Sequence, residues 1–307
     1  MIIVPDGELG YVPFESLLME EASGTNYTSL AYLLKKYQVS YAYSATLLFD
    51  GFKHERNPTH DGVISFAPSY PNKVTDSIQL LALGNFRDQI TNLVWNQKEA
   101  NQITQFVAGK PFTGEFATER SFKENAGDYN ILHLAMHALV DDENPMYSRL
   151  VFTQSEDSVE DNYLNTYELY NMKLNANLAV LSACNTGSGK LVRGEGIMSL
   201  ARGFAYAGCP SIVMSHWQVD DEATAQLMTS FYEGLSEGMT KSEALRQAQL
   251  TYLESADPRQ AHPFYWSSFV MIGENAPIKE SSNWWMYMLI GLILVGGIWA
   301  ISKKKNG

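Results

Sequence analysis

Short apolar runs recur along this chain, and segments with helical spacing separate them. Runs of this length that lack charges are typical of strands buried on both faces of a sheet. Strands that alternate with helices favour a mostly parallel sheet with helices packed against it. The sequence therefore predicts an α/β fold. The predicted strands include residues 38–43, 61–68, 129–137, 177–184, 209–215 and 269–272.

Two chemically reactive residues close two of these runs. His137 ends the run that starts at Tyr129, and Cys184 ends the run that starts at Asn177. Reactive groups gather beyond the carboxyl ends of strands in open α/β sheets, so neighbouring strands would bring the imidazole and the thiol to one cleft. A nearby imidazole lowers the pKa of a thiol and protonates a leaving amine. On spacing alone, a buried Cys and an unrelated His remain the simpler interpretation.

A second histidine raises the question of a metal site. His133 precedes His137 by four residues, as in zinc proteases. That pattern requires a Glu where this chain has Leu134, and a helix where the sequence predicts a strand. We therefore predict no metal and no cofactor. His133 is interpreted as a core histidine hydrogen-bonded to the backbone.

A glycine-rich segment follows the predicted nucleophile. Gly187–Lys190 superficially resembles a phosphate-binding loop, but Cys184 stands where the motif needs its first glycine and Leu191 where it needs Ser or Thr. The segment fits better as a rim beside the nucleophile, where backbone approaches a substrate. The other cysteine, Cys209, is interpreted as structural. Two cysteines make no disulfide framework, so they leave the compartment undecided.

The charge of the chain narrows the classes of partner. The 307 residues carry a formal charge of −12, and three lysines lie among the last five residues, so the rest of the chain carries −15. Such an acidic domain argues against nucleic-acid binding and is compatible with basic protein or peptide substrates. Asp220, Asp221 and Glu222 follow a predicted strand and are expected to cap the next helix. A pocket carboxylate that selects a basic side chain remains open for one of them.

The C-terminal region predicts a membrane anchor. Residues 284–302 contain no charge, begin with Trp-Trp-Met-Tyr and precede the three lysines. This length spans a bilayer core, aromatic residues suit its interface, and lysines suit the cytoplasmic side. We therefore expect a domain over residues 1–275, a linker over 276–283, a transmembrane helix over 284–302 and a basic tail over 303–307. A core helix would have to be apolar all round at this position.

The N-terminus leaves the orientation in the membrane open. The chain starts directly on a predicted core strand, without a secretory signal. We therefore expect the chain to be the C-terminal part of a longer protein. An upstream signal would place the domain outside, with the lysines as a stop-transfer sequence. Without such a signal, the segment would be a tail anchor and the domain would face the cytoplasm.

Several motifs in a fixed order resemble the CHAT domain, a relative of caspases and separase. Pro5–Gly7 and Pro13-Phe14 match the start of that domain, so the resemblance covers nearly everything before the predicted membrane segment. The six remaining blocks are Ile131–His137, Leu181–Gly187, Gly194–Gly196, Leu200–Phe204, Ser215–Asp221 and His262–Trp266.

The resemblance implies a caspase-hemoglobinase fold and cysteine endopeptidase chemistry. By this likeness His137 is the base and Cys184 the nucleophile, and the backbone N–H groups of Cys184 and Ala138 form the oxyanion hole. The chain departs from the family pattern at one position, since a Gly usually follows the His. Ala138 keeps the N–H donor but adds a methyl group beside it.

The same likeness predicts where a substrate binds. Ser215 to Trp217 aligns with the strand edge that pairs with a bound peptide, and Trp217 would line the groove. Ser182 would sit at the primary specificity pocket, and Asp220 or Asp221 could favour a basic residue before the scissile bond. Relatives often carry helical repeats upstream, of the tetratricopeptide kind, that recruit or sense partners.

Two hypotheses about function follow. The first is a membrane-anchored cysteine endopeptidase that cleaves a protein substrate and is activated by a partner or by an upstream repeat domain. The alternative is a membrane-bound signalling or interaction module with the same fold that cleaves nothing. Labelling by an electrophilic peptide probe separates the two.

Overall fold

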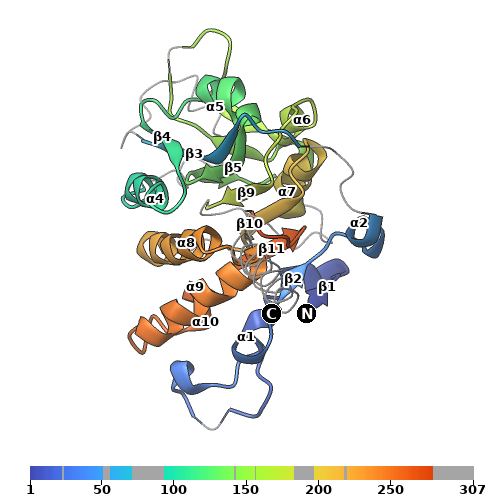
Figure 1. The fold of residues 1–307 in the computed structure, drawn as a ribbon, viewed down its shortest axis with the longest axis vertical. Helices are drawn as coiled ribbons and strands as arrows, with labels where there is room; N and C mark the ends of the chain where they lie inside the picture. The colour runs from blue at the N-terminus through green and yellow to red at the C-terminus, as the bar shows by residue number, and fades with distance from the viewer. Residues whose placement is uncertain are drawn as a thin grey trace, which may run out of the picture.

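The computed structural model describes residues 1–22, 24–50, 56–70, 93–141, 143–155, 157–182, 197–217 and 220–278. The strands of its main sheet are β1 (Ile2–Ile3), β2 (Ser40–Tyr41), β3 (His60–Pro68), β4 (Gly109–Gly114), β5 (Tyr129–Leu134), β9 (Leu178–Leu181), β10 (Ser211–Ser215) and β11 (Phe269–Gly273). Within these ranges, they pair in the order β1-β2-β11-β10-β9-β5-β3-β4 (Figure 1). β10 and β11 are antiparallel, and the other neighbours are parallel. The predicted α/β fold with a mostly parallel sheet is confirmed.

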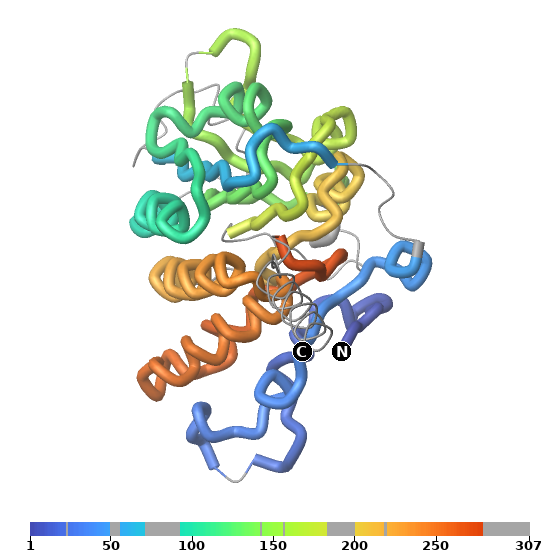
Figure 2. The backbone as a smooth tube through the Cα atoms, in the orientation of Figure 1, coloured from blue at the N-terminus to red at the C-terminus, as the bar shows by residue number. Residues whose placement is uncertain are grey.

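Helices cover both faces of this sheet. Their bounds are α1 (Leu33–Lys36), α2 (Ala45–Asp50), α4 (Asn96–Ile103), α5 (Glu119–Asn125), α6 (Thr166–Leu169), α7 (Ile197–Tyr206), α8 (Asp221–Ser236), α9 (Lys241–Ser255) and α10 (Pro263–Trp266). Short 3-10 turns are η1 (Gly7–Tyr11), η2 (Phe14–Ser16), η3 (Tyr27–Ser29), η5 (Ala126–Asp128) and η6 (Pro145–Tyr147). α4, α8 and α9 pack on one face, and α5 and α7 pack on the other (Figures 1 and 2).

The central strands are apolar because both of their faces are covered. Ile131 and Val180 belong to the core shared with α8 and α9. Their neighbours in sequence, Leu132 and Leu181, belong to the core shared with α5 and α7. All four side chains are fully buried. Successive residues of a strand point to opposite faces, so a doubly covered strand needs an unbroken apolar run.

A second, smaller sheet holds the predicted catalytic histidine. It consists of β6 (His137–Leu139), β7 (Arg149–Val151) and β8 (Tyr163–Asn165), which pair antiparallel. The prediction of one strand ending at His137 is wrong, because β5 ends at Leu134 and His137 begins β6. The neighbouring strand β3 reaches Pro68, which has no N–H to continue the ladder beyond this point. The apolar run thus continues from one sheet into another.

The sequence did not predict β4, α2 or α10. β4 contains Pro111 between two glycines, which argues against a strand, yet among the described residues it lies at the sheet edge and pairs only with β3. α2 and α10 are single short turns without a clear apolar period. The sequence pattern of residues 164–170 also predicts one short helix, whereas the structure has the end of β8 followed by α6.

The membrane prediction falls on residues that the structure does not describe. Among the described residues, every helix is too short or too polar to cross a bilayer. Residues 284–302 and 303–307, assigned above to the transmembrane helix and the basic tail, lie outside the described ranges. The anchor therefore stays a prediction.

Candidate active site

His137 begins β6 and is held in the interior. Its side chain is 3% exposed. Its backbone N–H donates to the Tyr70 hydroxyl at 3.0 Å, and that hydroxyl donates to the carbonyl of Val151 at 2.7 Å. The two rings lie close, with centroids 4.8 Å apart. Tyr70 therefore fixes both the backbone and the ring of His137, a role that the sequence did not predict.

The strand that leads to Cys184 is the direct neighbour of the strand that leads to His137. β9 pairs in parallel with β5, and the last pair of this ladder is Leu134 with Leu181. Both strands run the same way, so their carboxyl ends meet at one edge. Cys184, predicted as nucleophile and as an oxyanion donor, lies outside the described residues. The adjacency on which the predicted dyad depends is present.

Ser182 and Ala138, two further predicted site residues, are both buried. Ser182 follows β9, is 4% exposed, and its hydroxyl donates to Glu99 Oε1 at 2.5 Å. Ala138 lies in the middle of β6 opposite Leu150 and is fully buried. The Ser182 hydroxyl is thus engaged by a carboxylate of α4 in this structure.

The predicted substrate edge continues β10. Ser215 is the last residue of β10 and pairs with Phe269 of β11, whereas the ladder with β9 reaches only Met214. The Trp217 indole N–H donates to the carbonyl of Phe264 at 2.9 Å, and the two rings stack with centroids 6.1 Å apart. These contacts hold Trp217 flat beside α10 while part of its surface stays accessible.

Another histidine, His216, lies between Ser215 and Trp217 in the sequence. His216 is 4% exposed, and its ring nitrogens have no hydrogen-bond partner among the described residues. Burial lowers the pKa of His216 from 6.5 to about 4. The ring is therefore neutral at pH 7.

The acidic residues at the start of α8 accept hydrogen bonds from backbone N–H groups. Asp220 is its N-cap and accepts from the N–H groups of Glu222 and Ala223, both at 3.1 Å. The Asp221 carboxylate accepts from the N–H of Val94 at 3.1 Å, which ties the start of α8 to the segment before α4. The expected capping role is confirmed for Asp220. Asp221 adds a contact between two helices that are distant in sequence.

A buried polar cluster lies beneath the strand ends, and the sequence did not predict it. The Nε2 atom of His133 lies 3.0 Å from Glu99 Oε1, and its Nδ1 atom lies 3.2 Å from the Tyr232 hydroxyl. His133 is fully buried as expected, but its ring contacts side chains, so the predicted backbone partner is wrong. Burial, reinforced by the Glu99 carboxylate, raises the pKa of Tyr232 well above 10, and its hydroxyl keeps its proton. The sequence signal for this cluster is Glu99, a carboxylate on the buried face of α4.

Carboxylates gather at one other place, where a lysine already lies among them. Within the described residues, Glu119, Glu160 and Glu168 come close enough to share a cation. The Lys123 ammonium lies 2.6–2.7 Å from an oxygen of each of the three. Its charge offsets part of theirs, and the trio needs no metal ion to be held together.

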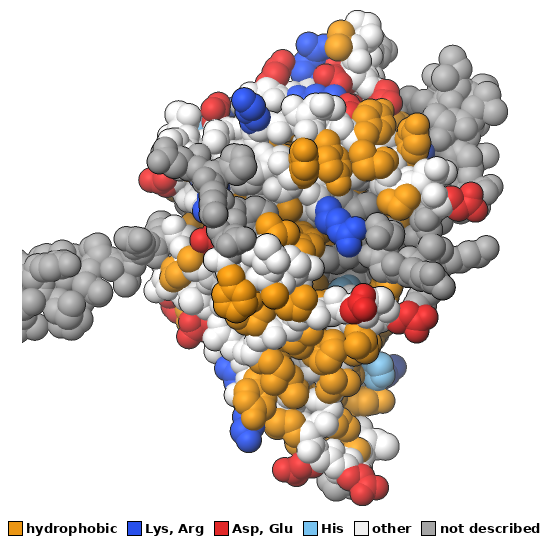
Figure 3. All heavy atoms as spheres, turned by 90° about the vertical axis from the view of Figure 1, so that its right-hand side faces the viewer, with side chains coloured by type: hydrophobic (Ala, Val, Ile, Leu, Met, Phe, Trp, Pro, Cys, Tyr) orange, Lys and Arg blue, Asp and Glu red, His pale blue; other side chains and the backbone are white. Residues whose placement is uncertain are grey.

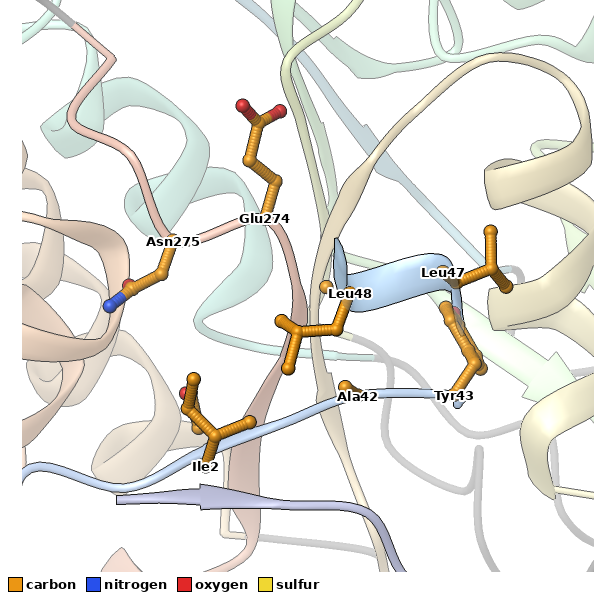
Figure 4. Close-up of a pocket in the computed structure, with 9 residues that line it drawn as sticks. Ile2, Ala42, Tyr43, Leu47, Leu48, Glu274 and Asn275 are labelled. Carbon is orange, nitrogen blue, oxygen red and sulfur yellow. The ribbon is translucent and has the colours of Figure 1, made fainter. Parts of the chain in front are cut away.

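Two cavities of the described part of the chain have no lining residue in common with the surroundings of His137 given above. One of about 290 Å³ lies between β1, β2 and the end of β11, where Ile2 and Leu48 face the same space and Glu274 lies across from them (Figure 4). Another, of about 630 Å³, lies between α2 and α7. In the described part of the chain, the linings of these two cavities include none of the predicted site residues.

Exposed hydrophobic side chains gather near the first of these cavities. Figure 3 shows them over the lower half of the face to which the N-terminal strands belong. Those of the first 19 residues are Met1, Ile2, Val4, Leu9, Leu17, Leu18 and Met19. The N-terminal segment thus carries much of the exposed apolar surface of the described residues.

A family model and two named proteins match most of this chain. A family model described as the CHAT domain matches residues 1–274. Tetratricopeptide repeat protein 28 of Mus musculus is 23% identical over 327 residues, and the Homo sapiens protein of that name is 24% identical. Each alignment covers 92% of this chain and 12% of the relative, so the chain spans a small part of their length.

Two solved structures match this chain at low sequence identity. The Arg-specific cysteine proteinase gingipain R has a TM-score of 0.47 at 12% identity, covering 78% of this chain and 54% of that one. The separase–securin complex of Saccharomyces cerevisiae has a TM-score of 0.48 at 13% identity, covering 86% and 14%.

Proposed function

The chain belongs to the CHAT domain family, and from this premise we propose that it is a cysteine endopeptidase with Cys184 as nucleophile and His137 as base. The observation that supports the proposal most is the parallel pairing of β5 with β9. His137 comes three residues after the end of β5, and Cys184 comes three residues after the end of β9. Adjacent strand ends bring a thiol and an imidazole to one edge, as a nucleophile and its base require.

The proposed reaction proceeds through an acyl-enzyme. The Cys184 thiolate attacks the carbonyl carbon of a peptide bond, and the oxyanion is stabilised by the backbone N–H groups of Cys184 and Ala138. His137 gives its proton to the leaving amine as the C–N bond breaks. A water molecule then loses a proton to His137 and attacks the thioester, which releases the acid and restores the thiol.

The proposed substrate path follows the end of β10. A peptide in extended form would lie along Ser215 to Trp217, with the indole against its side chains. Ser182 lies near the proposed primary pocket, where its hydroxyl is already bound to Glu99. Asp220 and Asp221 would add negative charge on the side that receives a basic residue.

The membrane anchoring and the activation of the enzyme are also proposals. Residues 284–302 would anchor the chain in a membrane by a single helix, with the catalytic domain on either side. A tetratricopeptide-type repeat domain upstream, or a separate activator, would control the activity. This partner class is supported by the name of the two relatives, tetratricopeptide repeat protein 28, and by the 12% of their length that this chain spans.

A labelling experiment tests the proposed chemistry. The full chain is incubated with peptidyl acyloxymethyl ketones that carry Arg or Asp at the terminal position, and adducts are located by mass spectrometry of peptides. We expect an adduct on Cys184 that is absent in Cys184→Ala and present in Cys209→Ala, because Cys209 is fully buried. Burial also raises the pKa of Cys209 to about 12, so this thiol is the matched control.

Three other outcomes have clear meanings. A preference for the Asp probe would contradict the role given to Asp220 and Asp221. No adduct with any probe, with or without an activating repeat domain, would favour the non-cleaving signalling module. An adduct retained in Cys184→Ala would contradict the assignment of the nucleophile.

A further inference from the structure

Helix α4 turns two polar side chains toward the sheet. Asn96 and Glu99 lie one helical turn apart and are 3% and 2% exposed. The Asn96 side-chain amide donates to the carbonyl of Pro68 at 2.8 Å and to that of Ala135 at 3.1 Å. Asn96 therefore links the end of β3 to the residue that directly follows β5.

Glu99 makes the corresponding link between β5 and β9. Its Oε1 atom accepts from the Ser182 hydroxyl at 2.5 Å and lies 3.0 Å from Nε2 of His133. The Tyr232 hydroxyl lies 3.2 Å from the other ring nitrogen of His133, Nδ1. The His133 contact is at ion-pair distance but not aligned as a hydrogen bond. One carboxylate of α4 thus bridges the two strands.

The rest of the α4 contact is apolar and close. Ala100, one residue after Glu99, packs with Ala67 and Ala135 in a fully buried cluster. Small side chains of this kind let the helix approach the sheet, and they would suffice to hold it there. Buried polar groups cost free energy unless they are satisfied, and satisfied networks fix geometry more than they add stability.

We infer that Asn96 and Glu99 are positioning residues for the proposed dyad. Asn96 holds Ala135, two residues before His137, and Glu99 holds Ser182, two residues before Cys184. Together they set the separation of the two strand ends from which the imidazole and the thiol extend. The inference rests on the proposed function. A displacement of about 1 Å at reacting groups can cost on the order of a hundredfold in rate.

The alkylation rate of Cys184 measures this positioning without a peptide substrate. Iodoacetamide is added to the full chain between pH 5 and 9, iodide leaves as the thioether forms, and Cys184 is quantified by peptide mass spectrometry. An imidazole at the correct distance keeps the thiol ionised at low pH, so wild type should react faster than His137→Ala at pH 6. In Glu99→Met and in Asn96→Leu we expect that rate to fall about ten- to a hundredfold, toward that of His137→Ala.

Two matched variants separate positioning from packing. Glu99→Gln keeps an oxygen acceptor for Ser182 and should restore most of the wild-type rate at pH 6. Ser65→Ala removes another fully buried hydroxyl that bonds to α4, at the Ala100 carbonyl. Ser65 lies on β3 opposite His133, and its side chain bonds to neither Ala135 nor Ser182. Its rate should equal that of wild type. Thermal unfolding followed by circular dichroism identifies which variants are folded. If Glu99→Met is unfolded, Asn96→Leu still tests the positioning role independently.

The possible failures are distinguishable. If wild type reacts faster than His137→Ala at pH 6 but folded Glu99→Met and Asn96→Leu match wild type, the positioning role is wrong and the proposed enzyme stands. If the alkylation rate of Cys184 depends on pH in the same way in wild type and His137→Ala, the proposed dyad is wrong. The positioning role, which depends on the dyad, is then wrong as well. A loss of rate in Ser65→Ala equal to that in Glu99→Met would reduce the effect to general packing of α4.

Discussion

Two buried carboxylates in different regions of the sheet invite comparison. Glu99 lies under the ends of β5 and β9, and Glu15 lies beside β2, toward the other edge. They are 2% and 3% exposed, and each accepts a hydrogen bond from a hydroxyl: Ser182 for Glu99 and Tyr41, at 2.7 Å, for Glu15. Glu99 also faces an imidazole, whereas burial raises the pKa of Glu15 from 4.5 to about 7 in spite of the Tyr41 hydroxyl.

The comparison shows that burial alone does not indicate what a carboxylate does. Glu15 joins one 3-10 turn to one strand, so its loss should affect stability and its dependence on pH. Glu99 joins two strands at the edge where reactive groups gather, so its loss should affect chemistry. The measurements below test whether the two regions separate in this way, with the largest expected effect first.

The dyad itself should give the largest effect, and only in the region of Glu99. His137→Ala removes the proposed base and should slow labelling of Cys184 by a peptidyl acyloxymethyl ketone about a hundred- to ten-thousandfold at pH 7. Glu15→Gln should leave the rate at the wild-type value. The measurement is the second-order rate of adduct formation. Equal rates for His137→Ala and wild type would remove the chemical distinction between the two regions.

The next largest effect concerns stability in the region of Glu15. The folded protein holds a proton on Glu15 up to about pH 7, whereas the unfolded chain releases it near 4.5. This carboxyl therefore stabilises the fold fully below pH 4.5, and that contribution is lost as the pH rises through 7, by about 3 kcal/mol. Glu15→Gln should remove this part of the pH dependence. The free energy of unfolding is measured in urea at pH 4.5, 6 and 8 for both proteins. If it falls with pH as steeply in Glu15→Gln as in wild type, the assignment of this pH dependence to Glu15 is wrong.

The middle of the fold was predictable because local pattern and tertiary environment agree there. β5, β9 and β10 are apolar runs, and their burial on both faces requires such runs. The split between β5 and β6 was not predictable, because the apolar run passes through a change of sheet without any change in residue type. β4 was missed because an edge strand tolerates a proline that a central strand excludes.

The sequence could assign roles only to residues that a family motif or simple chemistry identifies by type. His137 was assigned through the CHAT-like motif blocks, because spacing alone favours an unrelated histidine, and Asp220 was assigned because aspartates cap helices. Tyr70 and Asn96 act through contacts with residues 67 and 39 positions away, which no local pattern records. Cys184 lies outside the described residues, so its place beside His137 stays a prediction.

A pair of tyrosines allows a finer comparison of the two regions. Tyr70→Phe keeps the ring beside His137 but leaves the carbonyl of Val151 and the N–H of His137 without this hydroxyl. Tyr41→Phe removes the hydroxyl that donates to Glu15. Each change should lower the free energy of unfolding by about 1–3 kcal/mol, the cost of a buried polar group left without a partner.

Only one of these tyrosine variants should affect chemistry. Tyr70→Phe should also slow alkylation of Cys184 by iodoacetamide, while Tyr41→Phe should not. Urea unfolding and alkylation at pH 6 are measured on the same samples. If both variants slow the reaction equally, the effect follows stability and the two regions are not distinct.

The smallest effect should come from Trp217 at the proposed substrate edge. It should change probe binding and leave the maximal labelling rate unchanged. Trp217→Ala removes an indole held by Phe264 and deletes apolar contact area for a bound peptide, so the half-saturating probe concentration should rise by about tenfold or less. The maximal labelling rate should stay near wild type, because Trp217 lies on β10's continuation and not on the strands bridged by Glu99. Glu99→Met should show the reverse, a lower maximal rate with little change in half-saturation. Labelling over a range of probe concentrations separates the two, and a fall in maximal rate for Trp217→Ala would mean that the substrate edge also positions the dyad.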